Sequence, residues 1–347
     1  MTGDRLLVGN LDAEIELARA LTHGPHAALS AAAARLVGAA ASHMALLARP
    51  GDRLWLPAPA PLEELCAAAR ERELAIETGP LEQVAPAGAV CAWAETEAVA
   101  RLRRAEPDPQ PEPDDWRAAL WHLRPPAEVT GRVNHRGFSL ALSLERGWAL
   151  PGACLVRHPA EIEQQLAAGG AAAGVEGAWV VKAPFSAAGR ERLRLRGSEM
   201  GRGERVRIER LLSRFGVLLF EPWVERLDDL ACAGLVHRGG VRLFAPHWLE
   251  NDPRGVFRAA VIDDEGTRQS AEHREGVRAA AAAAGEALAA AGYLGPFSVD
   301  AYTWRDPSGH LQLQPMSEIN ARLSFGLLAR VAAEDAGAPG GPFELRP

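Results

Sequence analysis

Lysine is almost absent from this chain of 347 residues, in which Lys182 stands alone among 38 lysines and arginines. Arginine satisfies any surface position that needs only a positive charge, whereas lysine offers a compact ammonium on a flexible stem. A position that keeps lysine in such a composition is a candidate for a specific role, and a strand lysine that reaches phosphate oxygens is a well-attested one. The alternative is the chance survival of one lysine.

Cysteine is scarce too, and its spacing excludes several classes of protein. The four cysteines form no Cys-x-x-Cys pair, which fits free buried thiols in a reducing cytoplasm better than a disulfide framework or a zinc site: Cys66, Cys91, Cys154 and Cys232. The chain also lacks Gly-x-Ser-x-Gly and a cysteine with a nearby partner histidine. We therefore expect no covalent catalysis by a serine or cysteine nucleophile.

Basic charge in excess and long apolar runs are missing as well. The net charge of −7 and the pI near 5.9 argue against a general affinity for nucleic acid or for an anionic membrane. The chain opens with no signal peptide, and no apolar stretch is long enough to span a bilayer. We expect a cytoplasmic protein with no nucleic-acid or membrane partner.

Two glycine-rich phosphate motifs are absent. Gly-x-x-x-x-Gly-Lys-Ser/Thr does not occur, and no Gly-x-Gly-x-x-Gly follows the first predicted strand. A P-loop is thereby excluded, and dinucleotide binding has no support.

The N-terminal part alternates predicted strands and helices, which indicates an α/β fold with a largely parallel sheet. Strands are predicted over residues 5–9, 53–57, 74–77 and 89–93, and helices within 13–48, 62–72 and 95–104. Alternate prolines and acids over residues 106–115 cannot form a helix or a central strand, so this stretch is read as an exposed spacer.

The rest of the chain mixes helices with antiparallel strands, as in an α+β fold. Helices are predicted over residues 136–145, 159–168 and 279–291, and strands over 154–157, 179–182, 216–220, 230–237, 241–246, 297–304 and 310–319. The Lys182 strand runs into small residues that expose backbone N–H groups to an anion. The arginine-dense segment 190–214 is read as a solvated, mobile face, or alternatively as a lid over phosphates.

Three oxygen donors fall together in the last predicted hairpin. The side chains of Glu318 and Asn320 share one face because strands have a side-chain period of two, and Asp300 lies on the preceding strand, which a short turn brings alongside. Such donors can hold Mg²⁺, with substrate phosphate completing its shell. The alternative places the carboxylates on a solvent face.

Together these features resemble the ATP-grasp superfamily. The resemblance covers residues 127 to about 335 and is most specific at Glu318-Ile319-Asn320-Ala321-Arg322 with the upstream Asp300. It implies two α+β subdomains that grip ATP, over residues 127–215 and 216–347. Residues 1–126 then resemble the Rossmann-like pre-ATP-grasp domain that often precedes this module.

The resemblance implies roles at the phosphates and at the metal. Arg136 would contact the α-phosphate region, Lys182 would bridge the α- and β-phosphates, and Arg322 would face the transferred phosphoryl group. The phosphate loop would consist of Ser186, Ala187, Ala188 and Gly189. Asp300, Glu318 and Asn320 would ligate Mg²⁺, for which Mn²⁺ can substitute.

The resemblance also implies where the nucleoside binds. Glu221, Trp223 and Val224 would form a hinge whose backbone meets the adenine edge, and Asp229, or else Asp228, would accept from the ribose hydroxyls. Two positions depart from the family pattern: the phosphate loop has a single glycine, and Ala321 stands where many relatives have proline.

The implied reaction is the ATP- and Mg²⁺-dependent activation of a carboxylate as an acyl phosphate, followed by attack of an amine. Small-molecule or peptide acids and amines would be the substrates, and a homodimer is compatible with the exposed N-terminal domain. A kinase of the same fold and a non-catalytic nucleotide-binding protein are the alternatives. Substrate recognition is expected near the last strand and the insert before it, with these candidates: His247, Trp248, Asn251, Ser324, Phe325, Gly326 and Arg330. For each of them a purely structural role is the alternative.

Overall fold

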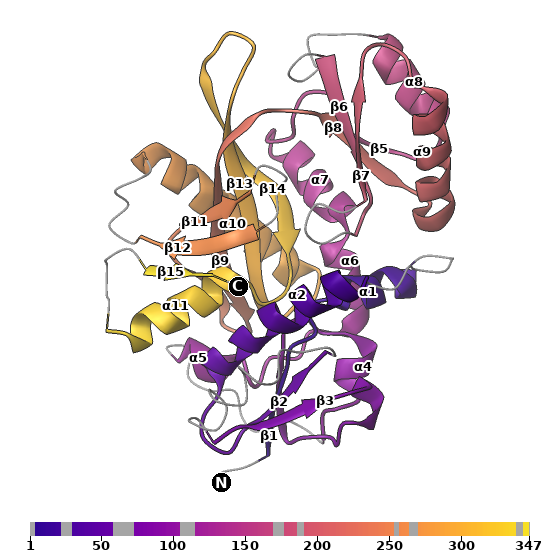
Figure 1. Cartoon of the computed structure of the whole chain (residues 1–347). Coiled ribbons are helices and arrows are strands. Elements are labelled where there is room, and N and C mark those ends of the chain that lie inside the picture. Colours follow the sequence, from indigo (N-terminus) through magenta and orange to yellow (C-terminus); the bar gives the residue numbers. More distant parts are fainter. Residues whose placement is uncertain are drawn as a thin grey trace.

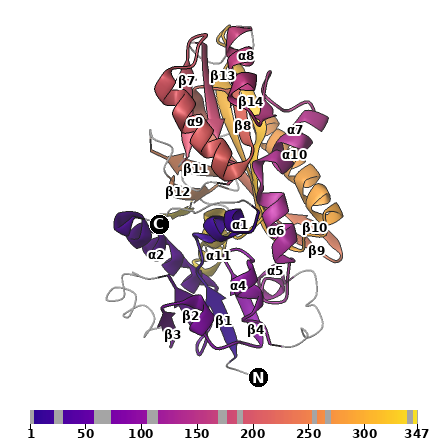
Figure 2. The same cartoon turned by 90° about the vertical axis from the view of Figure 1, so that its right-hand side faces the viewer.

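The computed structural model describes residues 4–21, 30–57, 73–104, 115–168, 177–185, 191–252, 257–263, 270–337 and 343–346. These residues form three β-sheets, each with its own helices. In Figure 1 the first sheet lies at the bottom, the second at the upper right and the third at the upper left. Helices α6 (Ala127–Asn134) and α7 (Arg136–Glu145) run through the space between the three sheets (Figures 1 and 2).

The first sheet is parallel throughout, as the alternation of strands and helices predicts. Its strands follow the order β3-β2-β1-β4, with these bounds: β1 (Arg5–Val8), β2 (Arg53–Leu56), β3 (Ala75–Thr78) and β4 (Ala89–Ala92). The central strand is apolar on both faces, because Leu7 packs into one core cluster and Leu6 and Val8 into another. Burial on both faces is typical of parallel sheets covered by helices.

The helical part of this domain is more broken than the sequence indicates. The alanine-rich residues 13–48 form α1 (Ala13–Leu21), α2 (Ala31–Ala41) and the 3₁₀ helix η1 (Ser42–Leu47), with Ser30 accepting a hydrogen bond as the N-cap of α2. Only a short helix, α4 (Glu97–Ala100), occupies the predicted 95–104. The predicted helix 62–72 and nearly all of the spacer 106–115 lie outside the described residues. Further short helices are η2 (Leu81–Gln83) and α5 (Trp116–Ala119).

The second sheet is antiparallel and carries Lys182. Its strands follow the order β5-β8-β6-β7: β5 (Cys154–Val156), β6 (Ala178–Lys182), β7 (Arg192–Arg196) and β8 (Leu218–Pro222). Helices α8 (Pro159–Ala167) and α9 (Arg202–Phe215) pack on one face through Ile162 and Ile208, against Trp179 and Val181 of β6. The period of two then turns Val180 and Lys182 to the opposite face.

One expectation for this region is corrected. The boundary after residue 215 assigned Leu218–Pro222 to the third segment, whereas β8 pairs with β5 and β6 in the second sheet. The arginine-dense segment contains β7 and α9, and its described arginines are exposed or half-buried, as a solvated face requires. The spacing of Ile208, Leu212 and Phe215 gives α9 an apolar stripe that is buried against the sheet, and the arginines cover its other side. The other domain boundaries remain predictions.

The third sheet is antiparallel and the largest. Its strands follow the order β14-β13-β9-β11-β12-β15, with β10 also paired to β9: β9 (Arg226–His237), β10 (Gly240–Leu243), β11 (His247–Asn251), β12 (Phe257–Ile262), β13 (Gly295–Arg305), β14 (Leu311–Asn320) and β15 (Phe343–Leu345). The predicted β9–β10 and β13–β14 hairpins are confirmed. The strands β11, β12 and β15 were not predicted.

Two helices cover this sheet. Helix α10 (Ala271–Ala290) contains the predicted 279–291, but it begins earlier, at the N-cap Ser270, and it packs on β9, β13 and β14. Helix α11 (Phe325–Asp335) packs on β12 and β15. Leu327, Leu328 and Val331 of α11 also share a core cluster with Leu7 and Leu54 of the parallel sheet. The first and third sheets are therefore joined by one continuous apolar core.

Within the described ranges, no helix combines the length and the apolar composition that crossing a membrane would require.

Candidate nucleotide and metal site

Arg136 links the second sheet to the third. It begins α7, and its buried guanidinium donates through Nη1 to the carbonyl of Ala183, next to Lys182, at 2.5 Å. Through Nη2 it pairs with Glu318 of β14, at 3.0 Å to Oε1 and 3.1 Å to Oε2. Arg136 and Glu318, which the resemblance assigns to one nucleotide site, are thus in direct contact.

Lys182 pairs with Glu221, so the predicted phosphate lysine meets the first residue of the predicted hinge. Both side chains lie on the face of the second sheet that is turned away from α8 and α9, and they form an ion pair. Burial lowers the pKa of the Lys182 ammonium, Arg226 and Arg136 lower it further, and Glu221 opposes the shift. A buried ammonium whose pKa is lowered in this way is stabilised when a negatively charged ligand binds beside it.

Asp300 and Glu318 are directly opposite each other in the β13–β14 hairpin, and Ser298 opposes Asn320. The Nδ2 group of Asn320 donates to Asp300 Oδ2 at 3.0 Å. Burial, and next the charge of Glu318, raise the pKa of Asp300 to about 7. The predicted face alignment is confirmed, and Asp300 is half-buried on this face.

The donor set of this carboxylate pair fits Mg²⁺. Within the described part of the chain, no three histidine, cysteine, aspartate or glutamate side chains gather into a metal-binding group. The set is therefore two carboxylates and one amide, which suits a cation that takes the rest of its shell from water and phosphate. The Oδ1 atom of Asn320 accepts from Arg322 Nη2 at 2.8 Å, and its second lone pair could ligate a metal.

Arg322 lies where β14 ends and faces the N-terminal domain. Its guanidinium lies 5.5 Å from the ring of Trp93, and Nη2 is 3.2 Å from Oε1 of Glu14 in α1. The residue expected to face the transferred phosphoryl group is therefore bordered by two residues of the parallel-sheet domain, which motif reasoning did not connect with it.

Arg226 is a further cation of the site that sequence reasoning missed. It opens β9 immediately after the hinge, lies over the ring of Tyr302 at 4.1 Å, and pairs with Asp229 at 3.1 Å. Its side chain remains 41% exposed, although its charge affects the pKa values of both Lys182 and Asp300. It is a solvent-accessible cation close to the predicted phosphate and metal groups. In the sequence, its position five residues after Glu221 of the predicted hinge could have marked Arg226 as a site residue.

A pocket lies beside these charges, between α7, β8 and the β13–β14 hairpin. Its lining includes Arg136, Leu219, Glu221, Tyr302 and Ser317. The backbone N–H of Trp223 donates to the carbonyl of Ala178, so this hinge donor is already used within the second sheet. Val224 packs with Leu140, Leu150 and Tyr302 into an apolar cluster that borders the pocket. The lining thus combines apolar side chains with the charged Arg136 and Glu221.

Asp229 also accepts from Asn251 at 2.8 Å, and Asp228 accepts from the hydroxyl of Thr303 at 3.0 Å. Ser186, Ala187, Ala188 and Gly189, the predicted phosphate loop, lie outside the described residues. The contact of these four loop residues with phosphate stays a prediction.

Of the predicted substrate residues, His247, Ser324, Phe325, Gly326 and Arg330 lie in or against α11, whereas Trp248 packs on the core cluster beside α10 and Asn251 donates to Asp229. His247 opposes Ala231 in β9, which opposes Asp300 in β13, so the three lie in one cross-strand row. The buried His247 ring packs so closely on Gly326 that a Cβ there would lie 2.0 Å from Nε2. Ser324 is the N-cap of α11, and Arg330 donates to the carbonyl of Ala245 at 3.4 Å. Each has a structural task, and their substrate roles stay predictions.

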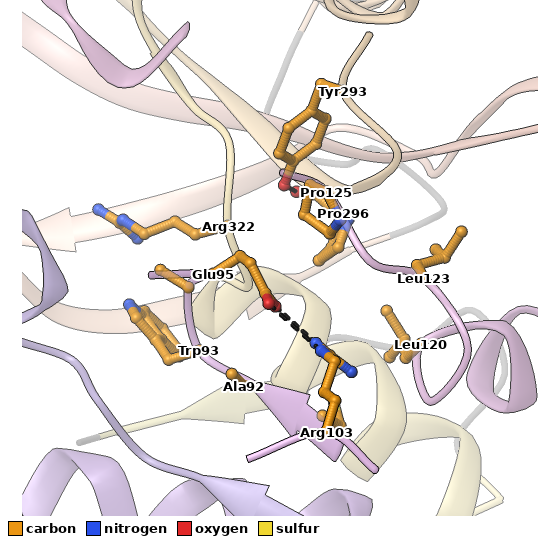
Figure 3. A pocket seen from close by; sticks show the side chains of 12 residues that line it. Ala92, Trp93, Glu95, Arg103, Leu120, Leu123, Pro125, Tyr293, Pro296 and Arg322 are labelled. Atoms are coloured by element: carbon orange, nitrogen blue, oxygen red, sulfur yellow. Dashed lines mark hydrogen bonds and ion pairs between the residues drawn. The ribbon is translucent and has the colours of Figure 1, made fainter. Parts of the chain in front are cut away.

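Another pocket separates the end of β4 from the third sheet (Figure 3). It is lined by Trp93, Glu95, Arg103, Tyr293, Pro296 and Arg322, among others. Glu95 and Arg103 form a buried ion pair at 2.5 Å, and Figure 3 shows this pair between the residues drawn. The carboxyl ends of parallel strands are where α/β sheets commonly bind ligands.

The structure defines a class of fold in which a parallel-sheet domain precedes two α+β units that grip the candidate site. Comparison with solved structures supports this class of fold. The biotin carboxylase domain of Hydrogenobacter thermophilus 2-oxoglutarate carboxylase, with MgADP, ADP and bicarbonate, aligns at a TM-score of 0.55 and 15% identity, covering 93% of this chain and 65% of that one. Biotin carboxylase from Campylobacter jejuni, in a β,γ-ATP complex, aligns at 0.54 and 10%, covering 97% and 69%. N5-carboxyaminoimidazole ribonucleotide synthetase from Thermus thermophilus aligns at 0.52 and 17%, covering 97% and 80%.

The chain therefore has the ATP-grasp fold with a preceding α/β domain, as the motifs predict. At these identities the likeness concerns the fold. No protein-family model matches the chain, and no curated protein sequence matches it significantly.

Proposed function

We propose that this protein is an ATP- and Mg²⁺-dependent ligase that activates a carboxylate as an acyl phosphate and passes the acyl group to an amine, releasing ADP and phosphate. The fold supports this proposal, because proteins that share it include a biotin carboxylase domain solved with MgADP and bicarbonate. The reaction asks the protein for positioning and charge neutralisation rather than for a nucleophile.

One observation carries the proposal: Arg136 joins the lysine strand to the paired carboxylates. Through it, Lys182 in the second sheet and Asp300 with Glu318 in the third belong to one continuous network. A phosphate chain needs cations along its length and a divalent cation at its end. Arg136, Lys182 and Arg226 supply the cations, and the hairpin carboxylates supply the place for Mg²⁺.

Each cation of the network has a carboxylate partner that a nucleotide would replace. Lys182 is held by Glu221, Arg136 by Glu318, and Arg226 by Asp229. Bound Mg²⁺ would neutralise phosphate charge and would be ligated by Glu318. Arg136 would then be free to bind phosphate oxygens. Arg322 is then the cation nearest the transferred phosphoryl group, where a planar guanidinium stabilises developing charge.

The acid and the amine would meet this end of the nucleotide between the third sheet and the N-terminal domain. The pocket lined by Trp93, Glu95 and Arg322 opens there, and Ser324 at the start of α11 follows the metal strand directly. A boundary between domains is a common place for small-molecule sites.

The proposal is tested by thermal denaturation with ATP and Mg²⁺, with ADP, with GTP and without ligand. A specific ligand at a concentration of about 100 times its Kd stabilises the native state by about 2.7 kcal/mol, which is a readily measured rise in Tm. We expect that rise for the wild type with ATP and Mg²⁺ and its loss in Glu318→Ala. Glu275→Ala, which removes an exposed carboxylate of α10, is the matched control and should keep the rise. A wild type that no nucleotide stabilises would contradict the proposal.

The reaction class is then decided by screening acids and amines for ADP release. A ligase releases ADP only when both substrates are present and forms an amide. ADP release with one substrate and a stable phosphorylated product would instead identify a kinase. Nucleotide binding without any turnover would identify a non-catalytic binding protein.

A further inference from the structure

Glu14 brings a carboxylate of the N-terminal domain to the phosphate end of the site. It lies in the first turn of α1, and α1 packs against α6 (Figures 1 and 2). Leu17 and Ala18 of the same helix belong to the apolar cluster of the second sheet, together with Val181 and Phe185. Helix α1 therefore joins the parallel-sheet domain to the strand that carries Lys182, and its packing fixes the position of Glu14.

The two oxygens of Glu14 are in different situations. Oε1 lies 3.2 Å from Nη2 of Arg322, and the side chains of the pair are 15% and 19% exposed. Oε2 is buried and accepts no hydrogen bond from the described residues. A buried carboxylate oxygen without a donor is unfavourable. The negative charge of Glu14 is therefore balanced chiefly by Arg322.

Glu14 also differs from Glu318 and Asp229, two other carboxylates that hold cations in this site. When a nucleotide binds, Glu318 has the metal as its new partner, and Asp229 has the ribose. The phosphate end of a nucleotide, which faces Arg322 in the proposed orientation, offers Glu14 neither a positive charge nor a hydrogen-bond donor. A γ-phosphate at Arg322 would place negative charge beside a carboxylate that has just lost its counter-ion. The charge of Glu14 also reaches Arg136: burial lowers the pKa of Arg136, but Glu318, Glu14 and Glu221 together raise it.

We propose that Glu14 is a positioning residue that holds Arg322 away from the γ-phosphate and so weakens the binding of ATP relative to ADP. This inference rests on the proposed function, because it requires that a nucleotide binds with its γ-phosphate toward Arg322. Binding of the γ-phosphate then has to break the contact between α1 and β14, which couples the nucleotide to the N-terminal domain. The site discriminates between ATP and ADP through a residue that touches neither of them.

The test compares Kd values by calorimetry, in the presence of Mg²⁺, for ADP and for the non-hydrolysable ATP analogue adenylyl imidodiphosphate. Glu14→Gln keeps the shape of the side chain and removes its charge. We expect it to bind the analogue about tenfold more tightly than the wild type does, with ADP affinity changed less than about twofold. Glu16→Gln is the matched control: it removes one charge from the same turn, and its amide oxygen can still accept from the N–H of Ala98.

A second variant separates charge from structure. Glu14→Asp keeps the charge but shortens the side chain, so the contact with Arg322 weakens while the repulsion of the γ-phosphate remains. We expect a clearly smaller gain in affinity for the analogue than in Glu14→Gln, whereas a merely structural role would give both variants the same effect. Equal changes for the analogue and ADP in Glu14→Gln, or no change, would overturn the inference while leaving nucleotide binding intact. A wild type that binds neither nucleotide would overturn the proposed function and this inference together.

Discussion

The guanidinium of Arg136 lies 3.0 Å from the carboxylate of Glu318, which follows it by 182 positions in the chain. The same guanidinium donates to the carbonyl of Ala183, one residue beyond Lys182. One side chain thus sets the spacing between the lysine strand and the carboxylate strand. Because Arg136 begins α7, this helix determines how far apart the two gripping sheets lie before a nucleotide binds.

Replacing Lys182 should nearly abolish ATP turnover without unfolding the protein. The side chains of Lys182 and Glu221 remain 18% and 15% exposed, so water can solvate the Glu221 carboxylate once the ammonium is gone, and the loss of stability should be modest. In Lys182→Ala we expect ATP turnover to fall by about 100-fold or more, with Tm changed by only a few degrees. Lys182→Arg should not restore turnover, because a flat guanidinium does not replace a compact ammonium. Arg196→Ala, on the exposed end of β7, is the control, and turnover retained in Lys182→Ala would contradict the assigned role.

Arg226→Gln should weaken ADP and ATP alike, by about fivefold to tenfold in Kd measured by calorimetry. The guanidinium is solvent-accessible, rests on Tyr302 and lies close enough to Lys182 to lower the pKa of that ammonium. Arg305→Gln, at the far end of β13, removes the same charge and should have no effect. If ADP affinity is unchanged in Arg226→Gln, the residue serves only to hold Asp229.

The protein should lose stability in mild acid through His135. Its Nδ1 accepts from the N–H of Gly137 and so caps α7, which requires a neutral imidazole. Burial, Arg136 and Arg157 all lower the pKa of His135 below 6.5. A lowered pKa in the folded state means that the unfolded chain binds a proton first, so the free energy of unfolding falls as the pH drops through about 6.5. Urea denaturation from about pH 7.5 to about pH 5.5 measures this slope.

His135→Asn provides the comparison, since asparagine is a good N-cap and does not titrate. We expect the two proteins to differ little at about pH 7.5 and the variant to depend less on pH below it. Identical slopes in the two proteins would show that other groups cause the acid sensitivity.

The Glu95–Arg103 ion pair should contribute less net stability to the folded protein than is lost when one partner alone is removed. Their side chains are 5% and 7% exposed, and burial raises the pKa of Glu95 although Arg103 opposes the shift. Glu95→Ala leaves a buried guanidinium without its carboxylate and should cost about 3–5 kcal/mol of unfolding free energy in urea. Glu95→Met combined with Arg103→Met should cost clearly less. A double variant as unstable as the single one would refute this account.

Sequence reasoning could place the carboxylates because their relation is local. Asp300 and Glu318 belong to one hairpin with a short turn, so the period of two predicts the face they share, although an irregularity between Asp300 and Tyr302 shifts their register in a way that the turn length does not predict. Lys182 was marked by composition and by its strand. Glu14 and Arg226 carry no motif, and their contacts depend on how three sheets pack, which no local pattern contains.

The errors in the fold prediction have equally specific causes. In the arginine-dense segment, charge hid the spacing of Ile208, Leu212 and Phe215, which was present in the sequence and predicts an amphipathic helix. The strand β11, His247–Asn251, mixes buried and half-buried side chains without strict alternation, because β9 and β12 flank it and α11 covers it. Strand β8 was assigned to the wrong sheet because adjacency in the chain says nothing about which edge a strand joins.

The apolar core shared by α11 and the parallel sheet has a practical consequence for anyone dividing this chain into fragments. A piece that begins at residue 127 would retain the third sheet but expose Leu327, Leu328 and Val331 of α11 to water. Such a fragment should aggregate on expression, although the cut falls between sheets. The smallest piece that remains dispersed in solution therefore includes β1 and β2, and the parallel-sheet domain serves the rest of the chain as a folding partner.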